Sequence, residues 1–403
     1  MSAGRTAALL AALIAALCAG LWLGGHPGEL PQPLRDAFVD DSTALSAEAT
    51  SVIEDNYFRE VGSDELAKAS VDGMVRSIRR RYRDRFSHYF SPESLARFNE
   101  SISGRFSGVG LSVSEVKRGL RVGRVFDGTP ASRAGIAVGD VIVSVNGKSI
   151  AGTDADIATA KIKGPEGSEV TVGVLQPSSG KTRAVRLTRE QIELPITTSR
   201  IIEVGGRKLG YVSLVSFTDG AHAFLRRAVR RVERRGAEGI VLDLRGNGGG
   251  LLQEAVLTSS IFLPKGDVVV STRSRTQGDT VYRTVGGNLP ARPLVVLINR
   301  DTASSAEILA SALADDGDAT VVGTRSYGKG VFQQVINLSG GGALDLTIGE
   351  FFTAEGISLA GKGIRPDVRA LDRPKTRPDE GLRRALGVLG GIVSGAEKQR
   401  ASG

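Results

Sequence analysis

The strongest constraint on the fold is an alternation of strand-like and helix-like segments between residues 200 and 370. Apolar runs such as GIVL (239–242) and PLVVLI (293–298) alternate with helical patterns, including the basic AHAFLRRAVRRVERRG (221–236). A strand that is apolar on both faces needs cover on both faces, which helices provide in parallel sheets. We therefore predict a largely parallel α/β sheet in this part of the chain.

Three polar or glycine-rich segments follow strands of this predicted sheet. They are LDLRGNGGG (242–250), NRDTASSAEI (299–308) and GTRSYGKGVFQQ (323–334). In open α/β sheets, sites form in the crevice beyond the carboxyl ends of the strands. We expect these three turns to build one site.

The stretch GTRSYGKG (323–330) is one residue short of a phosphate-binding loop, because Gly330 stands where Ser or Thr would bind Mg²⁺. VFQQVINL (331–338) follows, which is typical of a strand, whereas a phosphate loop opens a helix. Lys329 therefore has another role. Cys18 is the sole cysteine, and the three histidines lack ligand spacing. We expect no metal and no cofactor.

The first residues resemble a membrane-targeting segment. A basic Arg5 precedes nineteen uncharged residues, 7–25, which are about long enough to span a bilayer. We predict an uncleaved signal anchor over residues 1–26, with a cleaved leader as the alternative, and a Pro-rich spacer over 27–41. The body would then lie in the cell envelope on the extracytoplasmic side, anchored to the membrane. The net charge of +8 comes mostly from dispersed arginines, so we predict no nucleic-acid binding.

Residues 42–104 show three-and-four apolar spacing and predict helices, and a pattern of short strands begins at residue 105. The stretch TPASRAGIAVGDVIVSVNG (129–147) closely resembles a PDZ domain, for which we set the bounds 105–190. The resemblance implies an extended peptide added to a sheet edge, its terminal carboxylate held by backbone N–H groups. GVGLSV (108–113) would then bind the peptide through Val109, Gly110, Leu111 and Val113.

The chemistry of the α/β part depends on which base could activate a hydroxyl. A Ser-His-Asp triad needs a histidine, and only His222 lies in this part of the chain, so that arrangement is unsupported. A lysine amine can do the same work once burial in an apolar pocket disfavours its charged form. Lys329 lies between two glycines and two apolar strands, an unusual place for a solvated lysine.

Two of the three turns resemble the catalytic patterns of the C-terminal processing peptidases, also called tail-specific proteases. Residues 299–308 resemble N-x-G-S/T-A-S-A-S-E-I, and residues 326–333 resemble S-F/Y-G-K-G-x-x-Q. The resemblance implies Ser304 as nucleophile, Lys329 as general base and Gln333 as the side chain that orients the lysine. Asp301 replaces the usual Gly, and the inverted Ser305-Ala306 makes Ser305 a rival nucleophile.

The resemblance also covers D-L-R-x-N-x-G-G at 243–250 and G-I-x-P-D at 363–367, with Gly248 where the family often has Pro. It implies a crotonase/ClpP-like α/β catalytic domain over 191–370. The chain pattern separately predicts a C-terminal tail over 371–403 that holds a linker and one short helix. The oxyanion donors would be the backbone N–H of Ser305 and that of Gly249 or Gly250. Asp243 and Arg245 are interpreted as structural.

The sequence thus predicts a multidomain α/β (α+β) serine endopeptidase of the C-terminal processing type. Its substrates would be proteins or peptides with free C-terminal tails. The sequence leaves open whether the chain forms a homo-oligomer. The main alternative is a catalytically inactive, membrane-anchored PDZ scaffold. A crotonase-like enzyme acting on small thioesters is a further alternative, although it would not need a PDZ domain.

Overall fold

The computed structural model describes residues 12–17, 20, 41–315, 319–371 and 379–402. The predicted signal anchor (1–26) and spacer (27–41) lie almost entirely outside these residues. Within the described ranges, no helix combines the length and apolar character needed to cross a bilayer.

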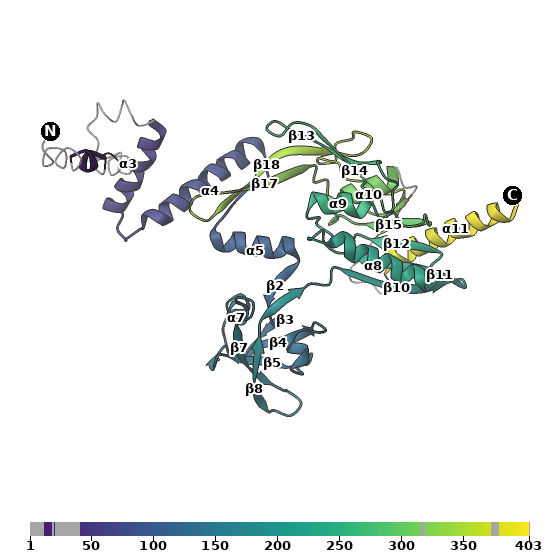
Figure 1. Cartoon of the computed structure of the whole chain (residues 1–403), viewed down its shortest axis with the longest axis horizontal. Coiled ribbons are helices and arrows are strands. Elements are labelled where there is room, and N and C mark those ends of the chain that lie inside the picture. The colour runs from purple at the N-terminus through teal and green to yellow at the C-terminus, as the bar shows by residue number, and fades with distance from the viewer. Residues whose placement is uncertain (1–11, 18–19, 21–40, 316–318, 372–378, 403) are drawn as a thin grey trace, which may run out of the picture. The chain divides into compact units, whose positions relative to one another are not determined.

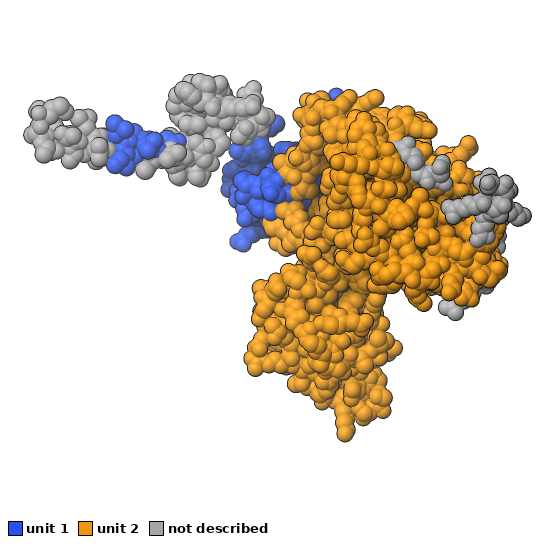
Figure 2. Space-filling model, turned by 45° about the vertical axis from the view of Figure 1, so that its right-hand side comes forward, with its two compact units in different colours: residues 1–91, 337–345 blue, residues 92–336, 346–403 orange. Residues whose placement is uncertain are grey.

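The chain divides into two compact units, which Figure 2 distinguishes by colour. Unit 1 comprises residues 1–91 and 337–345. Its described part holds the predicted helices α3 (Asp41–Asn56) and α4 (Ser63–Tyr82), followed by the short strand β1 (His88–Phe90). β1 pairs antiparallel with Ala343–Asp345, the first residues of β18 (Ala343–Phe352).

Unit 2 contains the predicted PDZ fold. Its antiparallel sheet runs in the order β3 (Leu111–Val116), β4 (Gly119–Val125), β5 (Val141–Val145), β7 (Glu169–Leu175) and β8 (Thr182–Thr188), and β6 (Lys148–Ser149) pairs with β5. The helices α6 (Pro130–Arg133) and α7 (Ala155–Ile162) complete it. The predicted Asn-Gly turn is present, since Asn146 and Gly147 both have positive φ, 50° and 76°.

The chain enters and leaves the PDZ fold through a two-stranded antiparallel ribbon. The helix α5 (Pro92–Ser103) leads into β2 (Arg105–Gly108), and β9 (Glu190–Glu193) pairs with β2 on the way out. Phe106 lies opposite Ile192 in this ribbon.

The α/β part is built on a six-stranded sheet whose core is parallel, as predicted. The order is β10 (Thr197–Val204), β11 (Arg207–Leu214), β12 (Gly239–Asp243), β15 (Leu294–Ile298), β16 (Thr320–Gly323) and β19 (Val368–Arg369), and only β10 is antiparallel to its neighbour. Ile240 and Leu242 point into one hydrophobic core and Val241 into another. Both faces are therefore covered, which explains the uninterrupted apolar strands.

Helices fill both faces of this sheet. The larger core holds residues of α8 (Ala221–Arg234), α9 (Leu252–Ser259) and α10 (Ser305–Asp315). The other core is closed by α11 (Glu380–Ser402), the C-terminal helix drawn in yellow in Figure 1. This helix buries Leu382, Leu386 and Leu389. The tail is thus more than the short helix that we predicted: α11 has 23 residues. Its apolar residues keep three-and-four spacing, but the interspersed glycines weaken the helical signal in the sequence.

Further strands lie beyond this sheet. β13 (Val268–Ser274) pairs antiparallel with β14 (Thr280–Arg283) and with Gly349–Phe352 of β18. β17 (Val331–Asn337) also pairs with β18, so the predicted strand after Lys329 is present.

Candidate active site

The three predicted turns meet, because they follow the adjacent parallel strands β12, β15 and β16. The Ala303 N–H donates a hydrogen bond to the Asn247 carbonyl oxygen at 2.9 Å, which joins the first turn to the second. The Tyr327 N–H donates to the Thr302 carbonyl oxygen at 3.0 Å, which joins the second turn to the third. One site at the carboxyl edge of the sheet results, as expected.

Ser304 stands in a left-handed backbone conformation immediately before α10. Its φ is 57°, and it is one of three non-glycine residues in the described chain with positive φ. The preceding turn is held by the Thr302 hydroxyl, which donates to the Leu244 carbonyl oxygen at 2.9 Å and accepts the Asn299 N–H at 3.0 Å. A non-glycine residue held in this sparsely populated backbone region marks a site where the surrounding structure enforces the geometry.

Ser305, the rival nucleophile, has a different environment. It lies in the first turn of α10, is 1% exposed, and its hydroxyl donates to the Gly250 carbonyl oxygen at 2.9 Å. This hydroxyl is buried and committed to a structural hydrogen bond, whereas Ser304 is half-buried.

The glycine turn packs directly against Ser304. A Cβ atom on Gly249 would lie 2.7 Å from the Ser304 Cβ, and one on Gly250 would lie 2.4 Å from the Phe217 carbonyl oxygen. Both glycines have positive φ, 97° and 146°. Close approach and backbone conformation therefore both require glycine at these positions.

Asn247 organises this turn from a fully buried position. Its side-chain Nδ2 donates to the Leu214 carbonyl oxygen at 2.9 Å, and its Oδ1 accepts the Gly249 N–H at 2.9 Å. The Gly249 N–H is therefore already engaged. In the described part of the chain, the N–H groups of Gly250 and Ser305 make no such hydrogen bond.

Lys329 lies in the third turn, between β16 and β17, and is half-buried. The glycines beside it allow the segment 359–363 to pack closely. A Cβ on Gly330 would lie 2.3 Å from the Ala360 nitrogen, and one on Gly328 2.9 Å from the Gly363 nitrogen. The Gly-Lys-Gly pattern therefore serves close packing around the lysine rather than a phosphate.

Gln333 lies on β17, four residues after the lysine, and is half-buried. Its Nε2 donates to the Thr347 hydroxyl on β18 at 3.2 Å. This contact restrains the amide plane.

The sequence reasoning assigned no role to Glu307, which links the second and third turns. Its side chain is fully buried, and its carboxylate accepts the N–H groups of Ser304, Gly328 and Lys329 together with the Ser326 hydroxyl. The available signal was one charged residue within the apolar helix AEILASALA (306–314). A charge at a core position needs compensating partners.

Two parts of the chain match models of known protein families. The family model described as "Peptidase family S41" matches residues 208–370, and a PDZ domain model matches residues 97–175. The chain belongs to peptidase family S41. The chain is also similar to a probable CtpA-like serine protease of Staphylococcus aureus, 35% identical over 327 residues. The match covers 80% of this chain and 64% of the staphylococcal protein, so the chain spans less than two thirds of that protein's length.

Two further similarities concern processing proteases. The carboxy-terminal processing protease CtpA of Bacillus subtilis is 31% identical over 318 residues, covering 79% of this chain and 66% of that protein. Among solved structures, the photosystem II D1 C-terminal processing protease aligns with a TM-score of 0.50 and 29% identity, covering 87% of this chain and 98% of the other.

Asp243 and Arg245 of the S41 domain form a network that reaches the C-terminal helix. Asp243 accepts the Tyr211 hydroxyl at 3.0 Å and the Arg245 Nη2 at 2.7 Å, and Arg245 also donates to Asp379 at 2.7 Å. Burial, together with the charge of Asp243, raises the pKa of Tyr211 to about 12. Burial alone would raise the pKa of Asp379, but hydrogen bonds from Arg245 and the Leu382 N–H outweigh it and lower this pKa. The network anchors the strand end that precedes the glycine turn.

His222 of the S41 domain is engaged elsewhere. Its Nδ1 lies 2.9 Å from Glu254, a buried carboxylate that also accepts the N–H groups of Gly220 and His222 at the start of α8. This histidine therefore belongs to a helix-capping arrangement.

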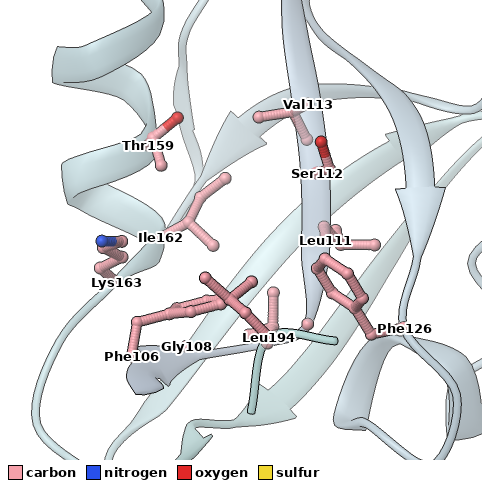
Figure 3. Close-up of a pocket in the computed structure, with 12 residues that line it drawn as sticks. Phe106, Gly108, Leu111, Ser112, Val113, Phe126, Thr159, Ile162, Lys163 and Leu194 are labelled. Carbon is pink, nitrogen blue, oxygen red and sulfur yellow. The ribbon is translucent and has the colours of Figure 1, made fainter. Parts of the chain in front are cut away.

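The PDZ domain contains a separate apolar pocket of about 280 Å³ (Figure 3). All four predicted residues, Val109, Gly110, Leu111 and Val113, line it. Further lining residues that sequence reasoning missed lie at the end of α7 and directly after it, and in the β2–β9 ribbon and at its end: Ile162, Lys163, Phe106 and Leu194. Gly110 has φ 84°, and a Cβ there would lie 2.3 Å from the Thr129 side chain. The tight path of this loop therefore requires glycine.

Proposed function

We propose that the chain is a serine endopeptidase of the C-terminal processing type, with Ser304 as nucleophile and Lys329 as general base. One observation carries the proposal: three turns converge on a serine in a left-handed conformation, with a glycine turn against its Cβ and a half-buried lysine on the third turn. The family membership supports it. The chain spans less than two thirds of the length of its staphylococcal relatives. The proposed activity is therefore inferred from this site and not carried over from those proteins.

The proposed reaction starts when the neutral Lys329 amine removes the proton of the Ser304 hydroxyl. The serine oxygen attacks the scissile carbonyl carbon, and a tetrahedral intermediate with a negative oxygen forms. Its collapse breaks the C–N bond, with a proton passing from the lysine to the leaving amine. Water then attacks the acyl-enzyme while Lys329 takes one of its protons. The bond between the acyl carbon and the Ser304 oxygen breaks, the lysine returns the proton to that oxygen, and the carboxylic acid product leaves. Gln333, restrained by Thr347, would orient the lysine.

The negative oxygen needs preorganised donors. We propose the N–H groups of Ser305 and Gly250. The alternative donor that we predicted, Gly249, would have to release the Asn247 oxygen before it could serve. Each such donor is typically worth ~10²–10³-fold in kcat.

The PDZ pocket would select the substrate. Its apolar lining suits an apolar C-terminal side chain, and the loop 108–113 would hold the terminal carboxylate. The predicted anchor would keep the enzyme at the extracytoplasmic face of the membrane, where it meets such substrates.

The proposal is tested by incubating the purified full chain with an unstructured, casein-like protein. Cleavage should disappear in Ser304→Ala and in Lys329→Ala. Labelling with a fluorophosphonate separates the two serines, since Ser305→Ala should still be labelled and Ser304→Ala should not. A wild-type chain that neither cleaves nor labels would favour the inactive scaffold.

Deletion of residues 105–190 then tests the PDZ domain. Unregulated cleavage would assign it an inhibitory role, and lost cleavage an activating one.

A further inference from the structure

We infer that Glu307 is a positioning residue that holds the nucleophile and the general base at a fixed separation. The inference rests on the proposed function and adds a residue to its set of Ser304, Lys329 and Gln333.

Each carboxylate oxygen of Glu307 joins two donors. Oε2 accepts the N–H of Ser304 and the N–H of Lys329, both at 2.9 Å. Oε1 accepts the Gly328 N–H at 2.7 Å and the Ser326 hydroxyl. One side chain therefore binds the backbones of both proposed reactive residues, which lie 25 positions apart in the sequence.

The hydrogen-bond directions require an ionised carboxylate. Ser326 accepts the Ile364 N–H at 2.6 Å, which leaves its own hydrogen for Glu307. All four groups that bind Glu307 are then donors. A carboxylate without a proton matches them, because it can only accept hydrogen bonds. Hydrogen bonds to an ionised group are the strong ones, and they compensate for the burial of the charge at 0% exposure.

Glu307 also explains how Ser304 can begin a helix and keep its hydroxyl for chemistry. Ser-x-x-Glu at a helix start is a capping box, in which the glutamate binds the serine N–H and the serine side chain binds the glutamate N–H. Here the glutamate half is present. The Glu307 N–H instead donates to the Ser304 carbonyl oxygen at 2.8 Å. This backbone bond takes the place of the serine half of the box, at a residue whose own φ is left-handed at 57°.

Loss of this link should reduce turnover more than binding. An error of about 1 Å in the placement of reacting groups can cost ~10²-fold in rate. Glu307→Gln keeps the shape of the side chain but replaces one carboxylate oxygen with an amide NH₂ group. This group would face two donors that it cannot accept. We expect a fall in kcat of about 10²-fold, with KM changed less than about twofold.

The experiment compares Glu307→Gln with Glu254→Gln in the full chain. Glu254 is also buried and also accepts two backbone N–H groups at a helix start, but its partners are Gly220 and His222. The measurements are kcat and KM on a fluorogenic peptide with a free C-terminal tail, the rate of fluorophosphonate labelling, and thermal unfolding. We expect both variants to lose stability and only Glu307→Gln to lose kcat and labelling rate by about 10²-fold.

Equal kcat losses in the two variants at equal stability would overturn the inference, as would an unchanged kcat in Glu307→Gln. If Glu307→Gln does not fold, Ser326→Ala removes one donor to the same carboxylate. It should lower kcat at constant KM, and an unchanged kcat would likewise overturn the inference. An inactive wild-type chain would refute the proposed function itself, which is a separate outcome.

Discussion

Replacing Gly249 with alanine places a methyl group directly against Ser304, the proposed nucleophile. The new Cβ would lie 2.7 Å from the Ser304 Cβ, 2.8 Å from the Ala303 carbonyl oxygen and 3.0 Å from the Ser305 nitrogen. Two of these three atoms are backbone, so a side-chain rotation cannot relieve the crowding.

The size of the effect follows from these distances. Ordinary contact begins at 3.4 Å, so the turn and Ser304 must separate by about 0.7 Å. Misplacement on that scale lowers turnover by roughly 10–100-fold, equivalent to about 1.4–2.7 kcal/mol in the activation barrier. The φ of 97° also strains an alanine in the folded state, which should lower the free energy of unfolding by about 1–2 kcal/mol.

Gly248→Ala is the matched control, because no atom lies within 4 Å of its added Cβ and its φ is not left-handed. The assay measures initial rates of peptide cleavage and thermal unfolding for both variants. We expect Gly248→Ala to stay within about twofold of the wild type. A Gly249→Ala variant as active as Gly248→Ala would refute the argument that this glycine positions Ser304.

Further expectations concern stability and the peptide pocket. Because the pKa of Asp379 is lowered, its stabilising effect is present above its ordinary pKa of 3.8 and is lost as the pH falls. Urea unfolding should therefore show a smaller difference between wild type and Asp379→Asn at pH 3 than at pH 7. The raised pKa of Tyr211 gives the opposite dependence. Its contribution to the free energy of unfolding is full below pH 10 and disappears as the pH rises towards 12. Tyr211→Phe should therefore lose less stability than the wild type over this alkaline range. Leu225→Ala, at a fully buried position, should cost about 2–5 kcal/mol in the free energy of unfolding, measured by urea denaturation. Leu111→Asp introduces a charge into the apolar PDZ pocket and should weaken binding of a C-terminal peptide at least about tenfold, measured by fluorescence anisotropy.

Local patterns were sufficient for most of the fold. The apolar runs at 239–242 and 293–298 predicted buried parallel strands, because such strands are apolar on both faces. The Asn-Gly pair at 146–147 predicted a tight hairpin turn, since few other residues adopt positive φ in succession. The helix at 380–402 was underestimated, because its burial depends on a sheet face formed by residues far away in the sequence, such as Leu209, Val241 and Val295.

The site was predicted only in part. Sequence patterns indicated Ser304 and Lys329, but several contacts depend on which backbone atoms meet. The commitment of the Gly249 N–H to Asn247 is one such contact, and the burial of the Ser305 hydroxyl against Gly250 is another.

The sequence by itself determined which segments form the apolar strands, which turns follow them and which kinds of reactive side chain those turns carry. These properties depend on residues that are neighbours in the chain. Tertiary structure alone decided which serine is accessible and which carboxylate joins the two reactive segments. Those properties depend on backbone groups that only the folded sheet brings within hydrogen-bonding distance, and no residue pattern records that distance.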